Sequence, residues 1–267
     1  PMDNANVRKA LIAAIDRTDF AAQFAGDANL ATQTWTPPLI WGYVDGPALG
    51  IGIPFDVTQA QAYLTAAGYP NGAGLPAVAV EVRDTSRNRL RWDYMAAAWQ
   101  ANLNITISVT YIGTNPPAQP INFTGWCGDY NEAFNFVGDG IQYLNAAGRL
   151  GGWSNAAYDA LIDQISQEAD LPTRLGLYED VEQILVEDEA VIGPLHNTMR
   201  ATLTKPYLQR TISGLSQDYW YEWSLIMEAE ANYDPGNTMN FEPGVDTTAY
   251  QLPAAAFTQA MVLAHTA

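Results

Sequence analysis

The chain has 267 residues, of which 48% are hydrophobic and 15% are charged. This is enough apolar material for a sizeable core and excludes a disordered or fibrous protein. Twelve Lys and Arg against 29 Asp and Glu give a formal net charge of −17, which opposes binding to nucleic acid or to an anionic membrane over most of the surface. No apolar run approaches the roughly 20 residues of a membrane span, so we expect no transmembrane segment.

The first predicted element is a helix over residues 6–17, because its apolar side chains recur on one helical face. Asn4 or Asn6 is placed to cap its first turn. This start has neither the basic nor the apolar region of a signal peptide. If the protein is exported, its targeting segment must lie outside this sequence. Gly and Pro then become frequent over residues 36–54, which predicts a long ordered loop.

A second helix is predicted after residue 56, with Asp56 or Thr58 as its cap and Gly68 in the left-handed position that ends it. A strand, a helix and a second strand are expected next, at residues 78–82, 87–103 and 105–111. Such a βαβ unit predicts a parallel pair of strands. A third strand is expected over residues 121–126.

Two amphipathic helices are predicted at residues 155–168 and 173–188, followed by strands at 191–197 and 201–207. The acidic residues at 187–189 fall at a helix C-terminus, where the helix dipole disfavours them, so we expect them to be solvated or near a partner. Residues 229–267 are expected to form an irregular tail in which residues 254–263 can form a short helix.

The richest cluster of polar and aromatic side chains directly follows the third strand, at Trp126, Cys127, Gly128, Asp129, Tyr130, Asn131 and Glu132. Ligand groups in open α/β sheets are commonly placed at such strand ends. A carboxylate beside flat rings suits a ligand amine held by a charge-assisted hydrogen bond, with apolar parts stacked on the rings. The alternative is that Trp126 and Tyr130 are core aromatics and Asp129 is a turn residue.

An enzyme has less support in the sequence. Neither a Gly-x-Ser-x-Gly motif nor a paired His-Glu zinc motif occurs, and the only histidines are His196 and His265. Cys127 near Asp129 is a conceivable nucleophile, but no histidine is placed beside it in the sequence. A single cysteine also rules out an internal disulfide and a cysteine-based metal cluster. We therefore expect no metal, no cofactor and no catalysis.

Several segments, in this order, resemble the C-terminal half of the oligopeptide/dipeptide-binding proteins of ABC importers. They are NVRKALIAAIDR, FDVTQAQAYLTAAGYPNGAGLP, LNITISV, GWCGDYNEA, WSNAAYDALI and TRLGLYEDVEQILVEDEAVIGPLHN. Each segment alone is weak, but their shared order over residues 6–197 is specific. The stretch LTKPYLQRTISGL at 203–215 extends the resemblance.

The resemblance implies a two-lobed α/β clamp that holds a solute between its lobes and delivers it to an ABC permease. In oligopeptide-binding members the segment like GWCGDYNE supplies an aspartate that pairs with the α-amine of a peptide. That role falls on Asp129, with Trp126, Cys127 and Gly128 as neighbours that can meet the ligand. A location in the periplasm or outside the cell is implied, with a lipid anchor, if there is one, in a segment absent from this chain.

We therefore expect an α/β fold: a periplasmic-binding-protein-like lobe with a mixed sheet flanked by helices, plus part of the second lobe. The expected divisions are a C-terminal ligand-binding lobe over 1–200, crossover strands over 201–228 that return to the N-terminal lobe, and the tail at 229–267. Family members are longer, so a missing N-terminal lobe or a companion chain is expected. A receptor for carbohydrate, a peptide hydrolase and a scaffold that has lost its ligand remain as alternatives.

Overall fold

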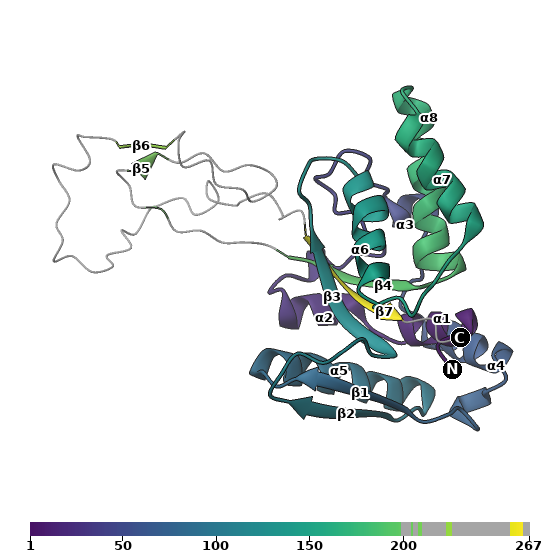
Figure 1. Ribbon diagram of the computed structural model, residues 1–267. Coiled ribbons are helices and arrows are strands. Elements are labelled where there is room, and N and C mark those ends of the chain that lie inside the picture. Colours follow the sequence, from purple (N-terminus) through teal and green to yellow (C-terminus); the bar gives the residue numbers. More distant parts are fainter. Residues whose placement is uncertain (199–203, 205–207, 210–222, 226–256, 264–267) are drawn as a thin grey trace, which may run out of the picture.

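A computed structural model describes residues 1–198, 204, 208–209, 223–225 and 257–263 (Figure 1). The helices are α1 (Ala5–Ala13), α2 (Arg17–Phe24), η1 (Ala28–Leu30), α3 (Gly46–Leu49), α4 (Val57–Ala66), η2 (Pro70–Gly72), α5 (Ser86–Leu103), η3 (Asn135–Gly140), α6 (Ile141–Ala146), α7 (Ala156–Gln167), α8 (Leu171–Gln183) and η4 (Ile184–Asp188). The strands are β1 (Val78–Arg83), β2 (Ile107–Ile112), β3 (Ile121–Cys127), β4 (Ile192–Asn197), β5 (Leu208–Gln209), β6 (Ser224–Leu225) and β7 (Phe257–Leu263). Among the described helices, none is both long and apolar enough to cross a membrane.

The helix starts follow the capping chemistry of the sequence. Asn4 caps α1 by accepting a hydrogen bond from the Asn6 backbone N–H at 2.9 Å. Asp56 caps α4 in the same way, through the backbone N–H of Gln59. Gly68, just after α4, has φ of +92°, the left-handed conformation that glycine adopts without strain. The predicted beginnings of α1 and α4 and the end of α4 are confirmed. The first helix, expected to reach residue 17, instead ends at Ala13, because Asp16 caps a separate helix, α2, that begins at Arg17.

The predicted βαβ unit is confirmed, since β1 and β2 pair in parallel and α5 connects them. A second sheet has the order β3-β7-β4, and β7 is antiparallel to both neighbours, so β3 and β4 run in the same direction. In Figure 1 this sheet lies between the β1–β2 layer below and helices α6, α7 and α8 above. The predicted strand at 201–207 falls outside the described residues, apart from residue 204.

The possible short helix at 254–263 is wrong, because residues 257–263 form strand β7. Its backbone pairs with β3 on one side and with β4 on the other. Such long-range pairing overrides local preference, and nothing within the segment indicates it. The rest of the predicted tail lies outside the described residues, as do the predicted boundaries at 200 and 228, so the domain divisions stay predictions.

Buried apolar side chains form two clusters. The first joins α1, α4 and α5 to β1 and β2, and its largest members include Trp99, Met95 and Leu64. The second joins the loop around Trp35 to η3, α6, α7 and α8, and includes Tyr178. Burial of apolar side chains in such clusters is the main favourable contribution to the stability of a fold.

The predicted ordered loop is fixed by carboxylates of the α8–η4 segment. Glu182, which is fully buried, accepts backbone N–H bonds from Trp35 at 2.9 Å and Thr36 at 2.8 Å. Glu187 accepts the backbone N–H of Gly52 at 3.0 Å. Both carboxylates satisfy loop donors that would otherwise be unpaired. Of the predicted acidic cluster at 187–189, Glu187 is thus bound within the chain, whereas Asp188 is exposed to solvent as expected.

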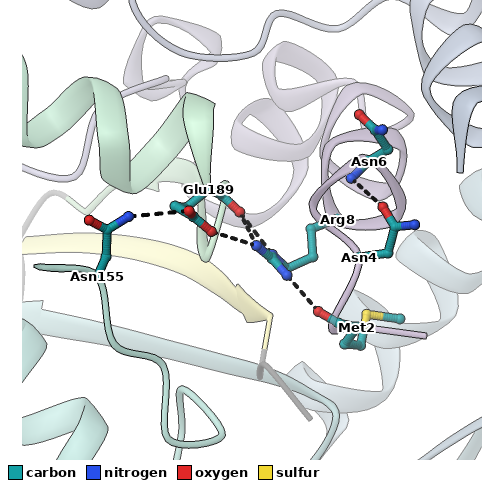
Figure 2. Close-up of polar contacts among 6 residues, drawn as sticks. All are labelled: Met2, Asn4, Asn6, Arg8, Asn155 and Glu189. Carbon is teal, nitrogen blue, oxygen red and sulfur yellow. Dashed lines mark hydrogen bonds and ion pairs between the residues drawn. The ribbon is translucent and has the colours of Figure 1, made fainter. Parts of the chain in front are cut away.

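Arg8 joins the first helix to the end of η4 (Figure 2). Its side chain is 1% exposed, and its guanidinium donates to the Met2 carbonyl at 2.7 Å and to the Glu189 carbonyl at 2.5 and 2.8 Å. The Glu189 carboxylate lies 3.3 Å from the same group and also accepts a hydrogen bond from Asn155 at 3.2 Å. Residues 181 positions apart in the sequence thus share one polar cluster.

Replacing Arg8 by Met is expected to lower the free energy of unfolding by about 3–5 kcal/mol, because it leaves buried carbonyls and part of a buried ion pair without a partner. Urea denaturation followed by circular dichroism measures this change. Arg89→Gln is the matched control, since Arg89 forms an exposed ion pair with Asp84, and it should alter stability little. Equal effects of the two substitutions would contradict the role given to Arg8.

Candidate functional site

The predicted site residues are brought together in the turn that joins β3 to η3. Strand β3 ends at Cys127, and the side chains of Asp129, Tyr130 and Asn131 are exposed. Trp126 is half-buried and Gly128 is buried. The run therefore combines a solvent-facing carboxylate with aromatic rings at the carboxyl end of a strand, as the sequence predicts.

Asn135 organises this turn. Its side-chain oxygen accepts hydrogen bonds from the Trp126 indole N–H and from the Asp129 backbone N–H, both at 3.0 Å. Its amide group donates to Asp139 at 3.2 Å, and the Tyr130 hydroxyl donates to the same Asp139 oxygen at 2.7 Å. Because Asn135 is 1% exposed, one buried amide fixes both the ring and the backbone around Asp129.

Asp129 itself has no hydrogen bond or ion pair from its carboxylate to any other part of the chain that the structure describes. Its backbone is held by Asn135, while the side chain is exposed. The alternative that Asp129 only shapes a turn would place its carboxylate on neighbouring backbone N–H groups, and no such bond is present among these residues. The geometry leaves the carboxylate available to a ligand.

Two further members of the run bind within the chain. Asn131 accepts the backbone N–H of Trp41 at 3.1 Å. Glu132 accepts the Tyr178 hydroxyl at 2.6 Å and forms an ion pair with Arg174. Asn131 thus joins the turn to the loop at residues 36–54, and Glu132 joins it to α8, so Glu132 has a structural role here.

Cys127 is poorly suited to act as a nucleophile. Its side chain is exposed, but desolvation by the neighbouring atoms, with a smaller contribution from the negative charge of Asp129, raises the pKa of its thiol, which disfavours the reactive thiolate. His196 is 1% exposed in β4, where it packs against Phe20 with ring centroids 5.8 Å apart. His265 lies outside the described residues.

A cavity of about 430 Å³ opens where β1 ends, α5 begins and β3 starts. Its walls include Arg83, Asn88, Trp92, Asn122, Phe123 and Arg149. These residues were not predicted from the sequence. Arg83, Asn88 and Trp92 lie at the carboxyl end of β1 and in the first turns of α5, where ligand sites of α/β sheets form, but Asn122, Phe123 and Arg149 carry no such signal. No cluster of three or more potential metal ligands occurs among the described residues.

Known proteins resemble this chain in both sequence and fold. Residues 1–140 match the family described as bacterial extracellular solute-binding proteins, family 5 Middle. The periplasmic murein peptide-binding protein MppA of Escherichia coli is 28% identical over 242 residues, which are 85% of this chain and 43% of that protein. The oligopeptide-binding protein OppA of Bacillus subtilis is 25% identical over 207 residues, or 73% of this chain and 37% of the relative.

The crystal structure of a periplasmic oligopeptide-binding protein of Borrelia burgdorferi superimposes with a TM-score of 0.60 at 27% identity, covering 71% of this chain and 38% of that one. The chain thus spans less than half the length of these relatives. The predicted periplasmic-binding-protein-like α/β fold is confirmed. The chain belongs to the bacterial extracellular solute-binding proteins of family 5.

Proposed function

We propose that the protein to which this chain belongs binds peptides, or a similar amine-bearing solute, and passes them unchanged to an ABC importer. The observation that supports this most directly is the Asp129 carboxylate, exposed and without a partner in the described chain, on a backbone fixed by Asn135. An ionised carboxylate held in this way forms a strong charge-assisted hydrogen bond with an ammonium group. In this proposal Asp129 receives the α-amine of the solute.

The residues around Asp129 complete the proposed contact. The Trp126 indole N–H donates a hydrogen bond to the Asn135 side chain, which fixes the ring. The centroids of the Trp126 and Tyr143 rings lie 5.5 Å apart. Such a ring surface offers apolar contact to the side chain or backbone of a peptide. Tyr130, Cys127, Gly128 and Asn131 are proposed as further neighbours of the ligand.

The relatives favour peptide among the solutes considered. MppA is named for murein peptides, and the Bacillus and Borrelia proteins for oligopeptides. The carbohydrate alternative is not favoured by these names. A hydrolase is not favoured either, since the relatives are named as binding proteins and the pKa of the Cys127 thiol is raised.

A second lobe is part of the proposal. The chain spans 43% of MppA and 37% of the Bacillus protein, so the remaining length can supply the opposite wall of the cleft, in the same chain or in a companion chain. The family description supports a location in the periplasm or outside the cell. Attachment through a lipid stays a prediction.

Asp129→Asn should weaken binding of a peptide with a free α-amine by about 10- to 100-fold, the range for loss of one hydrogen bond to a charged group. Isothermal titration with tri-alanine and N-acetyl-tri-alanine measures the effect, and the acetylated peptide should be nearly indifferent to the substitution. Asp163→Asn, on the exposed face of α7, is the control. Unchanged affinity of Asp129→Asn for tri-alanine would remove the central element of the proposal.

Asn135→Ala tests whether the buried amide positions Asp129. The substitution leaves the Trp126 indole and the Asp129 backbone N–H without their acceptor, so the free energy of unfolding should fall by about 1–3 kcal/mol. The preference for tri-alanine over its acetylated form should also fall, because the carboxylate is no longer held in place. The control is Asn102→Ala. Asn102 lies in α5, and its side chain donates a hydrogen bond to the Ala14 carbonyl. Its replacement should lower stability while the preference for tri-alanine is retained.

A further inference from the structure

Arg17 is a deeply buried cation whose hydrogen-bonding capacity the chain uses only in part. It is 4% exposed, and its Nε donates to the Pro194 carbonyl of β4 at 2.6 Å. Its two terminal nitrogens make no hydrogen bond within the described chain, yet neither is among the buried nitrogens that lack a partner there, so both stay accessible. Arg8 differs, because all three of its guanidinium nitrogens donate to oxygens of the chain.

The charge of Arg17 also has no counter-ion among the residues that the structure describes. Burial lowers the pKa of its guanidinium to about 10, with the negative charge of Asp16 acting in the opposite direction, so the group is still a cation at neutral pH. Asp16 forms no ion pair with it and instead accepts the backbone N–H of Asp19 as the cap of α2. Because a buried cation without a hydrogen-bonded anion is costly, Arg17 is suited to bind an anion.

Arg17 lines a cavity of about 230 Å³. The walls come from the start of α2, from residues 29–33 and 38–55, and from the end of β4. Of the described lining residues Arg17 alone is charged, and Thr18, Gln33 and Tyr43 add neutral hydroxyl and amide donors. The Thr18 and Gln33 side chains make no hydrogen bond to the described chain. One cation with neutral donors and no carboxylate suits an oxyanion.

This cavity is separate from the candidate solute site. The Asp129 turn follows β3, at one edge of the β3-β7-β4 sheet, whereas the cavity lies at the other edge, where Ala31 pairs with His196 of β4. Two strand spacings of about 5 Å each separate β3 from β4. None of its described lining residues also lines the cavity between β1, α5 and β3. Its occupant therefore need not be the solute.

We infer that the cavity beside Arg17 is a binding site for a small oxyanion, held by parallel hydrogen bonds from the two terminal nitrogens of the guanidinium. The inference does not depend on the proposed function. A free inorganic oxyanion and a carboxylate from a part of the protein outside the described residues share this chemistry. Either occupant would join α2 to residues 38–55 across the end of β4 and so stabilise this edge of the sheet.

Inorganic phosphate is the probe for a free oxyanion. Urea denaturation of the natively purified protein is compared in phosphate and in chloride at matched ionic strength, and phosphorus NMR measures binding directly. Two charge-assisted hydrogen bonds support a dissociation constant of about 1–10 mM. At about 50 mM, phosphate should therefore raise the equilibrium constant for folding by about 6- to 50-fold, and Arg17→Gln should abolish this gain.

Two matched variants make the result specific. Gln33→Glu keeps the bond of Arg17 to Pro194 and adds a carboxylate to the lining, so like-charge repulsion should weaken phosphate binding by about 10-fold or more. It tests the site even if Arg17→Gln folds poorly. Arg87→Gln removes an exposed cation of α5 that does not line the cavity, and it should keep the full effect of phosphate.

A crystal structure of the complete protein, grown without added oxyanion, identifies the source of the occupant. A carboxylate of the protein within about 3 Å of the Arg17 terminal nitrogens would show that the site is filled from within. Phosphate should then bind only after that acid is replaced by its amide. An ordered free anion at the same nitrogens would show that the source is the solution.

Three results would overturn the inference. One is the absence of any phosphate effect together with a structure in which no oxyanion meets Arg17. Another is a phosphate effect that survives unchanged in both Arg17→Gln and Gln33→Glu. The third is displacement of phosphate by tri-alanine, which would assign the cavity to the solute. None of these results bears on Asp129, so the proposed function stands or falls separately.

Discussion

The buried guanidinium of Arg8 is the contact on which the arrangement of the chain most depends. Its Nε and Nη2 both donate hydrogen bonds to the Glu189 carbonyl, at the point where η4 ends and the chain leads into β4. The next residue, Ala190, has φ of +50°, a left-handed conformation that costs an alanine about 1–2 kcal/mol. Arg8 thus stabilises a strained turn and at the same time attaches α1 to it.

This turn sets the course of β4, and through it the three-stranded sheet. Strand β4 pairs with β7, and β7 pairs with β3, whose carboxyl end carries the candidate site. Beyond β3 the chain enters the π-helical turn η3, where Asn135 reaches back to Trp126 and to the Asp129 backbone. The exposed carboxylate of Asp129 therefore sits on a backbone that the buried Asn135 holds by a hydrogen bond, which is how a binding group is kept in place without being neutralised.

Local patterns predicted most of the individual elements. Apolar periodicity and caps located α1, α4, α5, α7 and the strands of the βαβ unit, because these signals lie within a few residues of each other. The η3–α6 segment was not assigned, since Gly138 and Gly140 weaken a helical pattern. A side chain at Gly140 would come within 3.2 Å of the Trp126 ring, and one at Gly138 within 2.9 Å of Phe134, so close packing demands those glycines.

What the sequence did not indicate depends on residues far apart in the chain. The pairing of β7 between β3 and β4, the bond of Arg8 to Glu189 and the attachment of the 36–54 loop by Glu182 and Glu187 all join distant segments. The functional sites show the same difference. The run from Trp126 to Asn131 is contiguous and was predicted, whereas the cavity between the end of β1, the start of α5 and β3 is assembled from separate elements and was not.

The most direct test of the central claim is a crystal structure of the complete protein with a bound peptide. The account predicts that the peptide lies against this lobe at the carboxyl end of β3, with its α-amine within hydrogen-bond distance, about 3 Å, of the Asp129 carboxylate. A peptide held elsewhere, with Asp129 still facing solvent, would contradict the assignment of the site.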